Sequence, residues 1–107
     1  MSAATYSQTT AATSGMVKLL PLNPPNISIG VAITGGTATV TVQYSFDNPA
    51  NATDTLGTGM TWFNHAVLAS ITATTPGTIS FPVSAVRTVV SAISGATVTT
   101  TVLEAGA

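Results

Sequence analysis

The strongest constraint on the fold is a two-residue alternation over residues 26–46. Every second residue on either side of Gly35-Gly36 is apolar, and the residues between are mostly small or polar. Side chains of a β-strand point alternately to the two faces of a sheet, so this period indicates two half-buried strands. The two glycines can adopt the positive φ angles of a tight turn. The pattern therefore predicts a β-hairpin in which Ile33 lies opposite Ala38.

Other segments repeat the alternation over shorter stretches. Val86–Ala92 and Thr97–Glu104 flank Ser94-Gly95-Ala96, which predicts a second hairpin with a three-residue loop. Thr74-Thr75-Pro76-Gly77 has proline and glycine where a type II turn favours them. No segment has the period of a helix, and we expect seven or eight short strands. The chain is predicted to be all-β, a single-domain antiparallel β-sandwich or jelly roll.

The first fifteen residues lack this pattern. They are small and polar with one aromatic residue, Tyr6, and they have too little apolar surface to offset the entropy of ordering. We therefore expect residues 1–15 to form a flexible N-terminal arm unless a partner orders them. Residues 16–107 form the predicted sandwich domain, and its first strand is expected within residues 16–22, before Pro21 ends it.

The composition excludes most functions that depend on charge. Only five of the 107 residues are charged, Lys18, Asp47, Asp54, Arg87 and Glu104. Two basic residues cannot neutralise a run of phosphates, so nucleic acid is not an expected partner.

Catalysis, metal binding and cofactor binding are also not expected. The chain has no cysteine and one histidine, His65, so a zinc site would need its other ligands from three scattered carboxylates. No nucleophile elbow and no phosphate-binding glycine loop is present. We therefore expect no enzyme activity, no cofactor and no metal, and we interpret His65 as a turn or partner-contact residue.

No segment is typical of export or of a membrane. The N-terminus lacks the basic start and the apolar run of a secretory signal. The apolar patch at residues 16–22 is too short to cross a bilayer. We expect a protein that is made in the cytoplasm without export and has no membrane partner.

An uncharged surface of this kind favours assembly. Sheet edges are normally protected from association by charged residues, and here those charges are missing. Thr, Ala, Val and Ser make up 58 of the 107 residues. We infer that partners cover much of this surface. Trp62 and Phe63 are adjacent, so one is expected in the core and the other outside, and an outward aromatic residue is a candidate interface anchor.

Four segments carry a resemblance to a protein family. They are residues 42–49, 61–65, 81–87 and 95–103, and they resemble small virion proteins of tailed phages. The resemblance implies a capsid cement (decoration) protein of a short-tailed phage. Such a protein is a β-sandwich or jelly roll on the outside of the shell. As a homodimer or homotrimer it bridges neighbouring major capsid proteins, and it has no catalytic residues.

Within this interpretation we expect partner contacts on the arm, on the first strand and around the adjacent aromatic residues, namely at Tyr6, Met16, Val17, Leu19, Leu20, Trp62 and Phe63. Two alternatives remain open. One is another virion position, in the tail, the head-to-tail connector or a fibre base. The other is a carbohydrate-binding or surface-adhesion β-sandwich, although the sequence lacks the clustered acidic residues typical of that class.

Overall fold

The computed structural model describes residues 2–18, 27–79 and 83–104, and these residues are all-β, as predicted. They form eight strands and one short 3-10 turn, η1. The elements are β1 (Ser2–Gln8), β2 (Val17–Lys18), β3 (Ile27–Thr34), β4 (Thr37–Ser45), η1 (Pro49–Asn51), β5 (Phe63–Asn64), β6 (Thr75–Ile79), β7 (Ala85–Ser94) and β8 (Thr97–Glu104).

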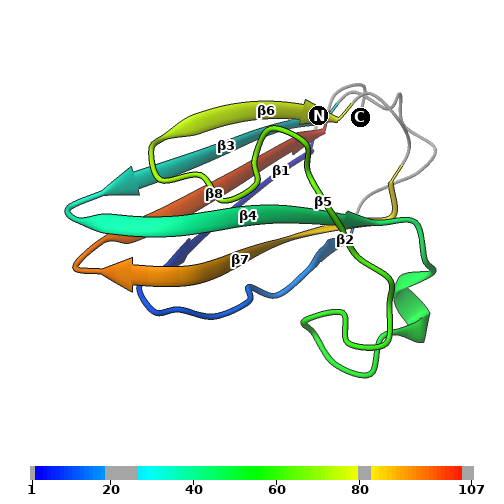
Figure 1. Ribbon diagram of the computed structural model, residues 1–107. Coiled ribbons are helices and arrows are strands. Elements are labelled where there is room, and N and C mark those ends of the chain that lie inside the picture. The colour runs from blue at the N-terminus through cyan, green and yellow to red at the C-terminus, as the bar shows by residue number, and fades with distance from the viewer. Residues whose placement is uncertain (1, 19–26, 80–82, 105–107) are drawn as a thin grey trace.

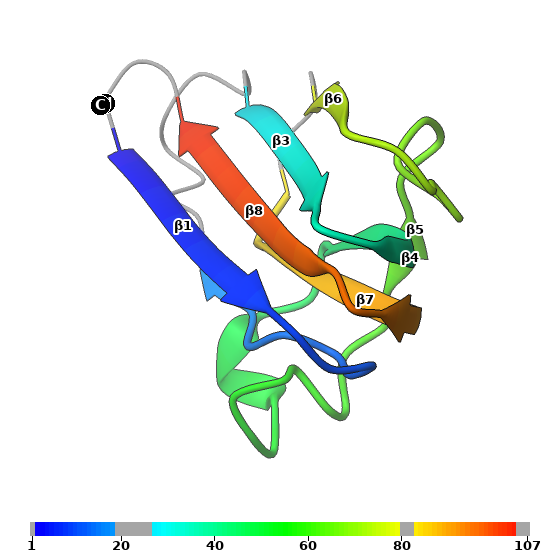
Figure 2. The same cartoon turned by 90° about the vertical axis from the view of Figure 1, so that its left-hand side faces the viewer.

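The strands form two four-stranded antiparallel sheets that pack face to face (Figures 1 and 2). Sheet A has the order β1-β8-β3-β6, and sheet B has the order β2-β7-β4-β5. Consecutive strands alternate between the sheets except for β4 and β5, which are neighbours in sheet B. This is the winding of an eight-stranded jelly roll, so the predicted fold class is confirmed.

The predicted hairpin around Gly35-Gly36 is wrong, because β3 belongs to sheet A and β4 to sheet B. The connection is an arch that carries the chain across the core. A two-residue period cannot distinguish a hairpin from an arch, because the apolar side chains meet on one face of a sheet in a hairpin and across the core in an arch. At Gly36 a Cβ atom would collide with the backbone of Ser94 and Gly95, so the close approach of two arches requires glycine there.

The second predicted hairpin is also an arch. β7 lies in sheet B and β8 in sheet A, on either side of Gly95-Ala96. The two arches lie side by side, because β3 pairs with β8 and β4 pairs with β7. In Figure 1 both turns lie at the same end of the sandwich. The predicted turn at residues 74–77 is wrong too, since β6 continues through Pro76 and Gly77 along the edge of sheet A.

The expectation of a flexible N-terminal arm is corrected for residues 2–8. These residues form β1, which pairs with β8 along its whole length, from Ser2 opposite Glu104 to Gln8 opposite Val98. Backbone hydrogen bonds to a central strand stabilise this segment, a contribution that composition alone does not reveal. Residues 12–14 then run along β7, where the Val90 N–H donates to the Ala12 carbonyl.

The core lies between the two sheets and consists of isoleucine, valine, leucine and alanine, with members Ile27, Ile29, Val31, Ala38, Val40, Val42, Leu68, Ile79, Val83, Val86, Val90, Ala96, Val98 and Val102. One chain of hydroxyl groups crosses it. The Tyr6 hydroxyl is 2.8 Å from Thr88 Oγ1, which is 3.1 Å from Thr100 Oγ1. Both threonines are fully buried. Their mutual hydrogen bonds make these polar groups tolerable in an apolar interior.

Candidate binding surface

The outer face of sheet A is an uncharged array of small and hydroxyl-bearing side chains. Residues that alternate with the core positions point outward, among them Thr5, Ser7, Ser28, Gly30, Thr78, Thr97, Thr99, Thr101 and Leu103. Hydroxyl groups on β1 and β8 lie close to one another, with Thr5 Oγ1 3.4 Å from Thr101 Oγ1 and Ser7 Oγ 3.2 Å from Thr99 Oγ1. None of the residues named on this face is charged.

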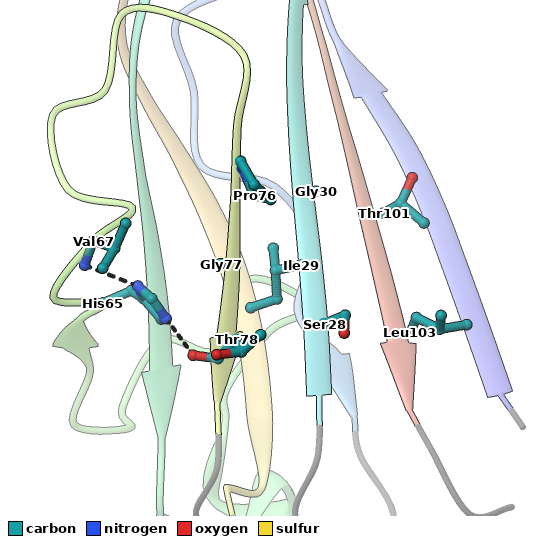
Figure 3. Close-up of a pocket in the computed structure, with 10 residues that line it drawn as sticks. All are labelled: Ser28, Ile29, Gly30, His65, Val67, Pro76, Gly77, Thr78, Thr101 and Leu103. Atoms are coloured by element: carbon teal, nitrogen blue, oxygen red, sulfur yellow. Dashed lines mark hydrogen bonds between the residues drawn. The ribbon is translucent and has the colours of Figure 1, made fainter.

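A groove of about 610 Å³ runs over the same face (Figure 3). Ser28 and Gly30 lie along its middle on β3, with Pro76 and Thr78 of β6 on one side and Thr101 and Leu103 of β8 on the other. Val67, which is 60% exposed, extends the groove beyond β6. A groove lined by methyl and ring carbons beside hydroxyl groups favours an apolar or neutral occupant.

His65 lines this groove and has a structural role. It is buried, with Nε2 2.8 Å from the Thr78 carbonyl oxygen, and its Nδ1 accepts the N–H groups of Val67 and Leu68, both at 3.1 Å. An Nδ1 atom that accepts two backbone hydrogen bonds carries no proton, so Nε2 is the donor to Thr78. Both ring nitrogens are thus occupied within the chain. The interpretation of His65 as a turn residue fits this geometry.

A second apolar surface lies at the end of the sandwich opposite the two arches. Tyr44, Phe46 and Phe63 form a cluster with ring centroids 5.5–5.9 Å apart. Phe46 is 55% exposed and Phe63 is 43% exposed, whereas Tyr44 packs against the core. Neighbouring exposed apolar side chains mark binding sites more often than isolated ones do.

Trp62 is not in the core, so the expectation that either Trp62 or Phe63 is a core residue is wrong. The indole lies against the loop that precedes it, where its Nε1–H donates to the Gly57 carbonyl at 3.0 Å. The Arg87 guanidinium lies over the indole ring, 4.3 Å from its centroid, in a cation–π contact. Arg87 also donates to Gln43 Oε1 and to the Leu56 carbonyl. Burial lowers the pKa of Arg87, and the nearby Asp54 carboxylate raises it.

The carboxylates of Asp47 and Asp54 stabilise the same loop. Asp47 accepts the Thr61 N–H at 2.6 Å. Asp54 accepts the N–H groups of Leu56 and Thr58 and the Thr58 hydroxyl. The hydrogen bonds from Thr58, that of its side chain first, lower the pKa of Asp54 below its ordinary value. Within residues 2–18, 27–79 and 83–104, no three His, Cys, Asp or Glu side chains gather as a metal site would require.

The residues predicted to contact a partner do not form one surface. Tyr6 points inward to Thr88 rather than outward. Met16 and Val17 are half-buried on and beside β2. Leu19 and Leu20 lie outside the described residues. Phe63 is the one residue of this set that the structure describes as strongly exposed.

The sequence reasoning missed the outer face of sheet A, the groove and Phe46. The alternation of threonine at 97, 99 and 101 with Val98, Thr100 and Val102 indicates an outward hydroxyl row. Its neighbours on β1 and β3 follow only from strand order, which local patterns do not encode. In the part of the chain that the structure describes, no helix is long and apolar enough to span a membrane. Comparison of the chain with protein-family models, curated proteins and solved structures finds no match.

Proposed function

We propose that this chain is a structural virion protein that binds the outside of a tailed-phage capsid and cements neighbouring major capsid proteins. The outer face of sheet A carries the proposal. It combines an uncharged hydroxyl surface with an apolar groove of about 610 Å³. Such a face has little to repel a second protein surface and little to hold a charged small molecule.

The chemistry of the described residues supports a binding role rather than a catalytic one. His65 and Asp54 use both polar atoms of their side chains in hydrogen bonds within the chain, and Asp47 uses one carboxylate oxygen. A general acid or base must be able to reach a substrate proton, and these three groups are already engaged in stabilising loops. The resemblance of residues 42–49, 61–65, 81–87 and 95–103 to phage virion proteins suggests the partner. A capsid repeats the same modest interface many times by symmetry.

Copy number in purified particles is the first test. Quantitative mass spectrometry against the major capsid protein should give a ratio near one to one, or a simple fraction such as two to three. A handful of copies per particle would move the protein to the tail, the connector or a fibre base. Absence from the particle would refute the virion assignment.

Charge placement then tests the binding face. Ser28 is exposed in the middle of the groove, and Ser91 is exposed on β7 of the opposite sheet. Ser28→Lys should abolish binding to shells that lack the protein, because the lysine must be desolvated in an apolar contact. Ser91→Lys adds the same charge and should bind normally. Equal binding by both variants would refute the assignment of this face.

One observation favours a second candidate, a carbohydrate-binding role. The exposed rings of Phe46 and Phe63 lie in one cluster and offer apolar faces to a sugar ring. In that case Phe63→Ala should remove binding on a glycan array, whereas Ser28→Lys should leave it unchanged. A protein with no glycan binding on such an array does not have this function.

A further inference from the structure

The strands at the sheet edges differ in how much unpaired backbone they present. β2 and β5 are two residues long, and β6 contains Pro76. β1 is seven residues long and has no proline, glycine or charged residue. Proteins protect sheet edges with short strands, prolines or charges. Among the described strands, β1 is therefore the long edge without such protection.

The hydrogen-bond pattern of sheet A shows which backbone groups face its edges. In an antiparallel strand the N–H and C=O of one residue point to the same side, and those of the next residue point to the other. The Ile33 N–H donates to Thr74 Oγ1, beside β6. Odd-numbered residues of β3 therefore face β6, and even-numbered ones face β8. Gly30 thus bonds with its partner Thr101, so odd residues of β8 face β3.

The backbone N–H and C=O groups of β1 alternate in direction in the same way. Even-numbered residues of β8 face β1, where Thr100 lies opposite Tyr6. The backbone groups of Tyr6 and the other even-numbered residues of β1 therefore bond to β8. Those of Ala3, Thr5 and Ser7 point away from the sheet, and within the described residues β1 pairs with β8 alone.

The opposite edge of sheet A is closed. The residues of β6 that face away from β3 are Pro76 and Thr78. Proline has no N–H to donate, and the Thr78 carbonyl already accepts a hydrogen bond from His65. Sheet A can thus be extended at β1 but not at β6.

We propose that the free edge of β1 pairs with β1 of a second copy, antiparallel, about a two-fold axis at Thr5. In this register Thr5 lies opposite the same residue of the second copy, and Ala3 lies opposite Ser7. The three pairs form about six backbone hydrogen bonds, two for each pair. The result is one continuous sheet of eight strands with the order β6-β3-β8-β1-β1-β8-β3-β6.

A second copy suits this edge because the strand is self-complementary. An antiparallel pair of identical strands satisfies two-fold symmetry, which closes after two subunits. No like charges meet, and the paired Thr5 side chains lie on the outer face, where cross-strand Thr–Thr contacts are favourable. The inference goes beyond the proposed function, because it concerns the free protein and needs no capsid.

Two substitutions at Thr5 test the backbone pairing in solution. Thr5→Pro removes an N–H that faces the edge and leaves every β1–β8 hydrogen bond intact. It removes two of the hydrogen bonds at the axis, each worth about a factor of five in affinity, so Kd should rise about 25-fold. Thr5→Val retains the N–H and should dimerise like the unsubstituted chain. Analytical ultracentrifugation measures the Kd, and circular dichroism checks the fold.

Cross-linking provides a test that does not depend on proline. The chain has no cysteine, so Thr5→Cys introduces a single thiol at the axis. The two Cα atoms there are about 5.5 Å apart in the proposed register, within disulfide range. Thr101→Cys is the control, because residue 101 of the two copies is separated by three strand spacings, about 14 Å.

We expect oxidation to link the Thr5→Cys protein into dimers and to leave the Thr101→Cys protein monomeric. The proposal is overturned if the unsubstituted chain is monomeric at all concentrations, if Thr5→Pro folds and dimerises with unchanged Kd, or if the two cysteine variants cross-link equally. Loss of shell binding by Ser28→Lys with an intact dimer would leave this inference standing, so the two proposals can fail separately.

Discussion

Replacing Thr88 by valine tests how much the buried hydroxyl chain contributes to stability. Thr88 is fully buried and lies between Tyr6 and Thr100, with hydroxyl distances of 2.8 and 3.1 Å. Valine has nearly the shape of threonine, so the substitution removes hydrogen bonds without opening a cavity. The three hydroxyl groups connect β1 and β8 of sheet A with β7 of sheet B.

The expected cost follows from the partners that the substitution leaves behind. Thr88→Val removes the hydrogen-bond partner of the buried Thr100 hydroxyl and of the half-buried Tyr6 hydroxyl. An unsatisfied buried hydroxyl, such as that of Thr100, costs about 1–3 kcal/mol, and the more exposed hydroxyl of Tyr6 costs less. Together they should lower the free energy of unfolding by about 2–4 kcal/mol. For a domain of this size Tm should fall by roughly 10–25 °C. Thr100→Val should cost less, about 1–2 kcal/mol, because Thr88 keeps its bond to Tyr6.

The double variant Thr88→Val, Thr100→Val distinguishes this account from a simple packing effect. Replacing both partners of a hydrogen bond removes the unsatisfied group as well, so the double variant should be no less stable than Thr88→Val alone. Urea denaturation of the four proteins in the cycle gives a coupling energy, expected at about 1–2 kcal/mol. Additive costs for the two substitutions would refute the reasoning.

Three further predictions concern the loops. His65→Ala should lower the free energy of unfolding by about 2–4 kcal/mol in urea denaturation, because Val67, Leu68 and Thr78 lose their partners; an unchanged midpoint would contradict the structural role of this residue. Gly57→Ala should displace Trp62, because the added Cβ atom would collide with the indole and the φ angle of Gly57 is +86°. The fluorescence emission of Trp62, the single tryptophan, should then shift to longer wavelength. An unshifted spectrum argues against the packing of Trp62 on Gly57. The Asp54 carboxyl should titrate below its ordinary pKa. Its stabilisation of the loop is therefore complete above about pH 4 and is lost as the pH falls through the pKa of the folded state. An NMR titration should show this lowered midpoint, and Asp54→Asn should remove the response of the loop to acid.

The sequence predicts the buried face of each long strand, but it does not predict the partner of that strand. Alternation around Gly35-Gly36 correctly identifies Val31 and Val40 as core residues. It cannot decide between a hairpin and an arch, because both bring the same side chains together. The decision depends on β8 and β6, which occupy the two edges of β3 and are more than 40 residues distant in the sequence.

The candidate surface was unpredictable for the same reason. Its hydroxyl groups come from β1, β3, β6 and β8, and only the order of strands in sheet A makes them neighbours. The polar composition of residues 1–15 predicts an arm, because these residues have little apolar surface to bury. Ladder hydrogen bonds to β8 stabilise Ser2–Gln8 instead. The sequence predicts Phe63 as a candidate anchor through its adjacency to Trp62, whereas the place of Phe46 beside Phe63 depends on tertiary structure.

The position of β8 between β1 and β3 has a consequence for folding on the ribosome. Thr5 and Thr101 are neighbours in sheet A although 96 residues separate them. Neither β1 nor β3 acquires its central partner until Thr97–Glu104 has been synthesised, so sheet A cannot form gradually as the chain emerges. A topology with such non-local pairing folds slowly, on the order of milliseconds to seconds. Until then β1 lacks its partner strand and β3 can pair only with β6, so the nascent chain presents uncharged strand edges. Its yield should depend on how quickly translation of residues 97–104 follows that of β1 and β3.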